Sequence, residues 1–199
     1  MPPPLPAGDK NKNPPDIGFL ALLREDKRTH YDSIWEQGFW AIAVHRFGNW
    51  RMDFKYRIAR FPLSIAYKVL NKAVEWFCGI SLPYTVLVGR RVRIWHHGGM
   101  ILHGREIGDD CQIRQCTTLG VARAHDNLAL PSIGTAVDIG CNVCILGNVR
   151  IGDRAVIGAG AVVLNDVPAD HIAVGVPARN FPNRDQYDTA PTGTETQNK

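Results

Sequence analysis

The residues with the clearest chemical potential are three histidines in the stretch RIWHHGGMILHG, residues 93–104. His96 and His97 are adjacent and are followed directly by two glycines, while His103 stands in the apolar segment MILHG. Histidine can take and return a proton near neutral pH because its unperturbed pKa lies close to neutrality. Glycine-rich backbone can expose N–H groups that stabilise an oxyanion. The HHGG sequence therefore predicts a base beside oxyanion donors, as deprotonation of an attacking hydroxyl would need.

A six-residue period organises the second half of the chain and must position these histidines. Hexads begin at aliphatic residues that are commonly followed by glycine and, four places later, by a small residue. These aliphatic residues are Ile107, Ile113, Leu119, Ile133, Ile139, Ile145, Ile151, Ile157 and Val163. Six residues suit one short strand plus a corner, and three hexads form a coil of about 18 residues. The period predicts stacked triangular coils with the aliphatic side chains on the axis.

The chain before the hexads has a different pattern. Residues 1–15 are rich in Pro, Asn and Lys and are expected to be disordered, as is the polar tail 182–199. Residues 16–80 are predicted to be an α-helical domain. One apolar helix face comprises Trp35, Phe39, Ile42, Ala43 and Phe47. Gly48 is expected to end that helix, and Pro62 to break or kink a second helix over 53–78.

Charge and composition narrow the class of protein. A net charge of +4 is too small and scattered to indicate nucleic-acid binding, although it suits a phosphate-bearing cofactor. Basic residues gather at 51–72, namely Arg51, Lys55, Arg57, Arg60, Lys68 and Lys72. They form either a solvated face with snorkelling side chains or a peripheral contact with an anionic membrane. With no secretory signal and five cysteines interpreted as reduced thiols, we expect a cytoplasmic protein, or one peripheral at the inner membrane.

The hexads resemble those of the left-handed parallel β-helix acyltransferases. The segments AIAVHRFGNW, IWHHGGMILHG, CTTLG, ILGNVRIGDRAVIGAGAVVLNDVP and AVGVPAR resemble serine acetyltransferase and related bacterial polysaccharide O-acetyltransferases. This resemblance implies a left-handed parallel β-helix over 81–181, interrupted by a loop at 120–131 and preceded by the helical domain. It also implies acetyl-CoA as donor, no metal, and a homotrimer with active sites between subunits.

The resemblance implies roles for individual acceptor-side residues. His97 aligns with the general base of the family, and His96 either orients the acceptor or is a structural corner residue. Ser81 aligns near the family's orienting aspartate. Residues of the loop 120–131 form either an acceptor clamp or an ordinary surface loop; they are Arg123, His125, Asp126 and Asn127.

The donor side is predicted in the C-terminal coils. Backbone of Gly140, Asn142, Gly158, Ala159 and Gly160 is expected to bind the pantetheine of CoA. The alternative for the glycines is corner geometry alone. Arg179 in GVPAR is the candidate for a CoA phosphate, with Arg154 a weaker one.

Three departures from serine acetyltransferase bear on the acceptor. Ser81, His96 and the pair Ala129–Leu130 stand where that family has charged groups that would meet serine. A zwitterion without charged partners is a poor fit. We therefore predict a sugar or polysaccharide-precursor hydroxyl as the small-molecule or glycan acceptor, with serine O-acetyltransferase as the alternative.

Two further functions are remote alternatives, and the cysteines allow other roles. A zinc enzyme like γ-carbonic anhydrase is disfavoured because no two histidines are five apart here, and a non-catalytic scaffold because WHHGG and GVPAR are retained. Cys141 and Cys144 form a lone C-x-x-C, weak as a zinc signature. Cys116 stays open as a nucleophile.

Overall fold

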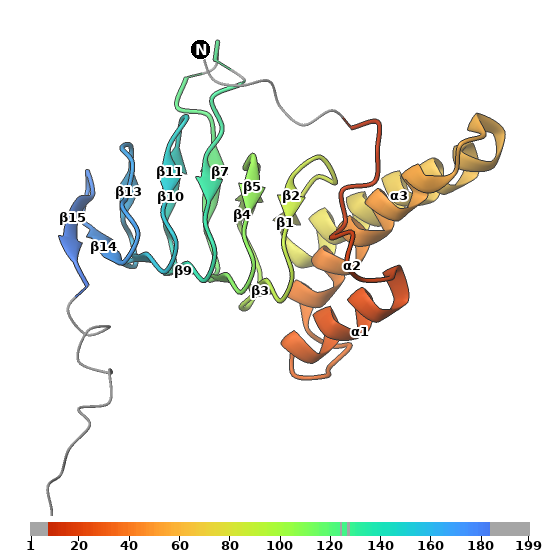
Figure 1. Cartoon of the computed structure of the whole chain (residues 1–199), viewed down its shortest axis with the longest axis horizontal. Coiled ribbons are helices and arrows are strands. Elements are labelled where there is room, and N and C mark those ends of the chain that lie inside the picture. The colour runs from red at the N-terminus through yellow and green to blue at the C-terminus, as the bar shows by residue number, and fades with distance from the viewer. Residues whose placement is uncertain (1–7, 124, 127, 184–199) are drawn as a thin grey trace, which may run out of the picture.

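The computed structural model describes residues 8–183 except 124 and 127. Three helices precede a long stack of short strands (Figure 1). The helices are α1 (Phe19–Thr29), α2 (Gln37–Trp50) and α3 (Arg57–Cys78), with a short 3-10 turn at Arg51–Asp53.

The strands form three sheets, one for each side of a triangular coil. The first sheet has the order β1 (Ile80–Ser81), β4 (Met100–Leu102), β7 (Thr118–Gly120), β10 (Cys144–Leu146) and β13 (Val162–Val163). The second has the order β11 (Arg150–Ile151), β8 (Ser132–Ile133), β5 (Glu106–Ile107) and β2 (Leu87–Val88). The third has the order β15 (Arg179–Pro182), β14 (His171–Val174), β12 (Val156–Ile157), β9 (Asp138–Ile139), β6 (Gln112–Ile113) and β3 (Arg93–Ile94). Neighbours in each sheet are parallel and lie one coil apart, except for the antiparallel pair β14–β15 that closes the stack.

The core is made of aliphatic ladders that run along the stack. Ile94, Ile113, Ile139 and Ile157 occupy matching register positions in the third sheet, and each is no more than 1% exposed. The same holds for Leu102, Leu119, Ile145 and Val163 in the first sheet. Each such side chain contributes about 1.5–3 kcal/mol by its burial. The predicted stacked coils of parallel strands are therefore confirmed.

The structure corrects three of the helix predictions. Trp35 lies outside α2 and is 85% exposed, so the apolar face begins at Phe39. Gly48 does not end α2, which continues to Trp50. A Cβ at Gly48 would lie 2.5 Å from the Tyr67 ring, so this glycine allows α2 and α3 to approach closely. Pro62 does not break α3; it lies inside the helix, near its start.

The disorder predicted for residues 1–15 is wrong for the part that the structure describes. Asn13 donates its side-chain N–H to the Arg46 carbonyl (3.0 Å), and the Lys12 backbone N–H donates to the Asn49 side chain (3.1 Å). Residues 8–15 are thus bonded to α2. Residues 1–7 and 184–199, to which the remaining disorder predictions refer, lie outside the described residues.

A buried ion pair fixes the helices to the first coil. Arg46 on α2 and Asp26 on α1 are both fully buried at their side chains, with Nε and Oδ2 3.0 Å apart. Arg46 also donates to the backbone carbonyls of Val88 (2.7 Å) and Gly89 (2.6 Å). One guanidinium therefore joins two helices and a β-strand.

We expect Arg46→Met to lower the free energy of unfolding by about 3–5 kcal/mol, because it leaves a buried carboxylate unpaired. The exposed pair of Arg154 with Asp170 supplies the control. Arg154→Met should cost less than about 1 kcal/mol. Urea unfolding of both variants measures the difference. Equal losses would mean that the buried pair does not anchor the helices.

Candidate active site

His96 and His97 lie in an enlarged corner between β3 and β4. Ile94 pairs with Ile113 and Leu102 with Leu119, yet eight positions separate Ile94 from Leu102 and only six separate Ile113 from Leu119. The corner therefore holds two residues more than the corner stacked on it. Both histidines are exposed, and His96 adopts a φ of +60°. The extra length carries the two imidazoles out of the regular wall.

Aromatic and cationic side chains support the start of this corner. The Arg93 guanidinium lies 3.7 Å from the centroid of the Tyr31 ring and 3.6 Å from that of Trp95. Trp95 also donates its indole N–H to the Gln112 side chain at 2.7 Å. These contacts fix the residue that directly precedes His96.

The glycines of the corner are held by the end of α3. The Gly98 N–H donates to the Cys78 carbonyl (3.1 Å), and the Met100 N–H donates to the Gly79 carbonyl (2.9 Å). A Cβ at Gly79 would lie 2.9 Å from the Gly98 Cα, so the two segments need glycine to approach this closely. The Gly98 N–H is thus engaged in the fold, and the sequence-based expectation of free oxyanion donors does not hold for it.

The predicted CoA-binding backbone shares this edge of the coil. The corners on this edge are joined by hydrogen bonds into a column that runs along the stack. The Cys116 N–H donates to the Gly98 carbonyl (3.3 Å). In the next coils the Asn142 N–H donates to the Gln115 carbonyl (3.0 Å), and the Gly160 N–H donates to the Cys141 carbonyl (2.8 Å). The column therefore brings together the corner of His96 and His97 and the corners that hold Gly140, Asn142, Gly158, Ala159 and Gly160.

Two of the glycines are explained by stacking alone. A Cβ at Gly140 would lie 2.6 Å from the Ala159 nitrogen, and one at Gly158 would lie 2.6 Å from Val174 Cγ1. Gly160 faces open space and adopts a φ of +72°. These contacts favour the corner-geometry interpretation for Gly140 and Gly158 and leave Gly160 accessible to a ligand.

The two candidate phosphate partners differ in position. Arg179 is exposed and pairs in register with Val174, whose side chain lies against Gly158. It therefore stands at the C-terminal end of the same column. Arg154 lies on another edge and forms a two-bond ion pair with Asp170 at 2.7 and 2.6 Å. The geometry therefore favours Arg179.

A pocket of about 400 Å³ opens on the first sheet beside the histidine corner. Its wall includes Gly99, Ser81, His103 and Glu75 of α3. The Ser81 hydroxyl lies 3.0 Å from His103 Nε2 and 3.3 Å from Glu75 Oε1. Desolvation lowers the pKa of His103, and the charge of Glu75 opposes this shift.

Sequence reasoning missed two members of this pocket. It noted His103 only as part of an apolar segment, without a role in the site, and did not consider Glu75. The alternation in β4, where Met100 and Leu102 are buried and Ile101 is exposed, shows that the next outward residue is His103. That period was readable in the sequence. The contribution of Glu75 was not, because it depends on how α3 packs on β1.

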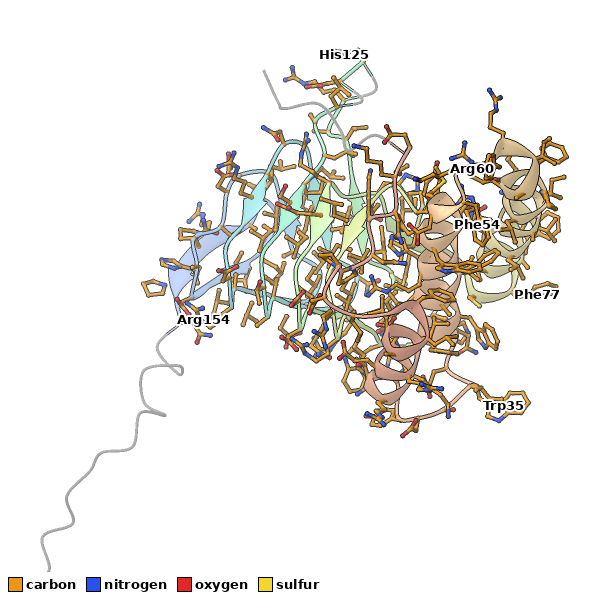
Figure 2. The ribbon with its side chains drawn as sticks, turned by 45° about the vertical axis from the view of Figure 1, so that its right-hand side comes forward. Trp35, Phe54, Arg60, Phe77, His125 and Arg154 are labelled. Carbon is orange, nitrogen blue, oxygen red and sulfur yellow. The ribbon has the colours of Figure 1, made fainter. Side chains whose placement is uncertain are left out.

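The loop residues do not meet the histidine corner within one chain. The loop follows the end of β7 and leads into β8, whereas His96 and His97 precede the start of β4. Since β4 and β7 are parallel neighbours, the first sheet lies between the two sites. Figure 2 shows His125 projecting from the wall, and Arg123 and Asp126 are also exposed. Asn127 lies outside the described residues.

Among the described residues, no group of three or more His, Cys, Asp or Glu side chains is arranged to hold a metal ion. Over the same residues, no helix has the length and apolar content to cross a bilayer. Cys141 and Cys144 are partly buried within regular coils.

Stacked coils with an enlarged histidine corner and a column of open corners define the class of hexapeptide-repeat acyltransferases. No protein-family model matches the chain. It is 39% identical over 120 residues to a relative from Escherichia coli K12 that is named a colanic acid biosynthesis acetyltransferase, WcaB, which covers 59% of this chain and 71% of the relative. The serine acetyltransferase structure from Vibrio cholerae matches with a TM-score of 0.68 at 25% identity, over 81% of this chain and 65% of that one.

A second solved structure, a serine acetyltransferase in complex with CoA, matches with a TM-score of 0.66 at 27% identity, over 82% of this chain and 69% of that one. This chain thus spans about two thirds of the length of these solved structures. The chain belongs to the hexapeptide-repeat acyltransferase family, in its acetyl-CoA-dependent O-acetyltransferase branch.

Chemical modification of Cys116 tests whether the adjacent histidine corner is the site of acetyl transfer. It is exposed, and its Sγ lies 3.6 Å from where a Cβ on Gly99 would be. We expect N-ethylmaleimide to modify Cys116 before the buried Cys78 and Cys111, and the adduct to remove most acetyl transfer by filling the space beside the corner. Mass spectrometry and thiol-release assays measure the two effects.

The control is Cys116→Ala, which should stay active and resist the reagent. A Cys116→Ala variant without activity would instead make Cys116 the nucleophile that the sequence left open.

Proposed function

We propose that this protein transfers an acetyl group directly from acetyl-CoA to a hydroxyl of a sugar or polysaccharide precursor. His97 takes the proton of the acceptor hydroxyl while its oxygen attacks the thioester carbonyl. The tetrahedral intermediate collapses, the carbon–sulfur bond breaks, and the imidazolium returns the proton to the CoA thiolate. His96 orients the acceptor beside the base.

The observation that carries the proposal is the composition of the pocket beside the corner. Its polar side chains are a serine hydroxyl, an imidazole and a carboxylate, and no lysine or arginine is present among the described residues that line it. Hydroxyl groups can donate to Glu75 and both donate to and accept from Ser81. Lys72 of α3 stands behind this wall but is already paired with the Glu75 carboxylate, so the described lining residues leave no unpaired cation for the carboxylate of an amino acid. This set favours a polyhydroxyl acceptor, with Ser81 on the acceptor side.

The donor would follow the column of corners. Backbone at Asn142, Ala159 and Gly160 would line the pantetheine, and Arg179 would pair with a phosphate at the far end of the column. All lie on the edge that carries His97, which supports a donor lying along that edge. No metal is needed for this transfer.

The assembly follows from the family. We propose left-handed coils, as the hexad resemblance implies, and a homotrimer with active sites between subunits. In that trimer, Arg123, His125 and Asp126 would meet the His97 corner of a neighbouring subunit. Their separation from His97 within one chain supports this arrangement. Dependence on acetyl-CoA would place the enzyme in the cytoplasm.

Serine O-acetylation is the second candidate function. It is favoured by the similarity to solved serine acetyltransferases. It requires that charged partners for serine come from a neighbouring subunit, because Ala129 is buried and cannot supply one.

Release of free thiol from acetyl-CoA tests the acceptor. We expect turnover with sugars, sugar nucleotides or oligosaccharides and little turnover with L-serine, because the pocket lacks a lysine or arginine. Mass spectrometry of the product should show one added acetyl group. Efficient serine acetylation with no response to any glycan acceptor would overturn the proposal in favour of the second candidate.

His97→Ala tests the base. It should lower kcat by about 10²–10⁴-fold with the fold intact, because a general base contributes on this scale. His171→Ala is the matched control, since this partly exposed histidine lies on β14, outside the corner, and contacts the Ala169 carbonyl through Nδ1 at 2.8 Å. The control should keep full activity. Equal rates for the two variants would remove His97 from the mechanism.

A further inference from the structure

Helix α3 has an apolar face on each side. Its inner face places Tyr67, Val74 and Cys78 in the core. Its outer face carries Ile58, Ile65, Val69 and Trp76, which recur at intervals of seven, four and seven residues. These intervals bring the four side chains to one stripe of a helix, opposite the buried residues.

The outer stripe is exposed to solvent along its length, least at Ile65, which is 48% exposed. Ile58 is 90% exposed, Trp76 is 77% exposed and Phe77, beside the stripe, is 82% exposed. Between Ile58 and Trp76 the stripe runs for about 27 Å at the rise of an α-helix. Figure 2 shows Phe77 at the edge of the molecule. An apolar surface of this length on one element indicates an interaction site.

Cations border the stripe. Arg57, Lys68 and Lys72 lie beside it on α3, and Lys72 is paired with Glu75, the one acidic residue of this helix. Arg60 stands seven residues before the buried Tyr67 and lies on the inner side of the helix. Lys68 and Lys72 line an apolar depression of about 490 Å³ together with Val69, Ala73, Trp76 and Phe77. Arg51, which the sequence grouped with this basic face, is buried with its guanidinium 4.2 Å from the ring centroids of both Tyr67 and Tyr84. The exposed basic face therefore belongs to α3 itself.

We propose that the outer face of α3 docks on an anionic lipid surface and lies in the plane of the interface. An amphipathic helix with aromatic and aliphatic side chains on its apolar face and lysine or arginine beside them has the chemistry of an interfacial helix. Its cations complement anionic head groups. A second copy of α3 is a poorer occupant, because a symmetric contact would bring the same cations together. The proposal does not depend on the identity of the acceptor.

Cosedimentation of the full chain with lipid vesicles tests this docking. We expect binding to vesicles of phosphatidylcholine with about one third phosphatidylglycerol, weaker binding at high salt, and little binding to phosphatidylcholine alone. The double variant Trp76→Ser/Phe77→Ser should lose most of the bound fraction. The charge variant Arg57→Glu/Lys68→Glu should lose binding with the apolar stripe intact.

Phe181→Ser is the matched control, because Phe181 is 51% exposed on β15, at the end of the molecule opposite α3 (Figure 1). It should bind vesicles as the unmodified chain does. Circular dichroism melts of all variants show whether each one is folded. Neither the melts nor the vesicle binding depends on enzyme activity, so this test remains valid if the acetyltransferase proposal fails.

Two results would overturn the docking proposal. One is an unmodified chain that binds neither kind of vesicle. The other is a folded Trp76→Ser/Phe77→Ser variant that light scattering shows as a smaller assembly while it still binds lipid, which would assign the stripe to a second copy of this chain.

Discussion

The arrangement of the helical region depends on one buried guanidinium. Arg46 pairs with Asp26 and donates to the carbonyls of Val88, in the second sheet, and of Gly89, just after it. Helices α1 and α2 therefore cannot shift along the coils without leaving a charge unpaired. Helix α3 packs on α2 where Gly48 allows close approach, and the end of α3 holds the Gly98 backbone. A constraint in the helical region thereby reaches the histidine corner, although neither Arg46 nor Asp26 lies near it in sequence.

The residues proposed for the chemistry lie where the repeat is irregular. The regular hexads dictate inward aliphatic side chains and short corners, which leave little side-chain surface for binding small molecules. The corner of His96 and His97 departs from that rule by two residues, and the loop at 120–131 departs from it by a whole excursion. The regular coils form a rigid support that can hold the proposed base in a fixed position. The two irregular segments can differ between proteins that use different acceptors.

The sequence was informative where structure is set by local periodicity. The hexads predict the ladders through Ile113, Ile139 and Ile157 because a six-residue repeat has only one way to bury its aliphatic positions. Boundaries set by contacts between elements were less accessible. Gly48 suits a helix end in sequence but serves the approach of Tyr67, and residues 8–15 are ordered by acceptors on α2. In the candidate site, the role of His97 stays a prediction from the family resemblance of its segment, whereas the place of Glu75 in the pocket depends on tertiary packing.

Helix α3 links the candidate pocket with the proposed lipid surface. Glu75 lines the pocket beside Ser81, and Trp76, the next residue, lies on the outer stripe. Adjacent residues on a helix point about 100° apart, so one turn can contribute to both surfaces without any change in conformation. An acceptor carried on a lipid would then approach a pocket already held beside the membrane. Local concentration would add to an affinity that an open pocket with only three polar side chains among its described residues cannot supply alone. On this argument, free sugars are weaker acceptors than membrane-attached ones even though both present the same hydroxyl.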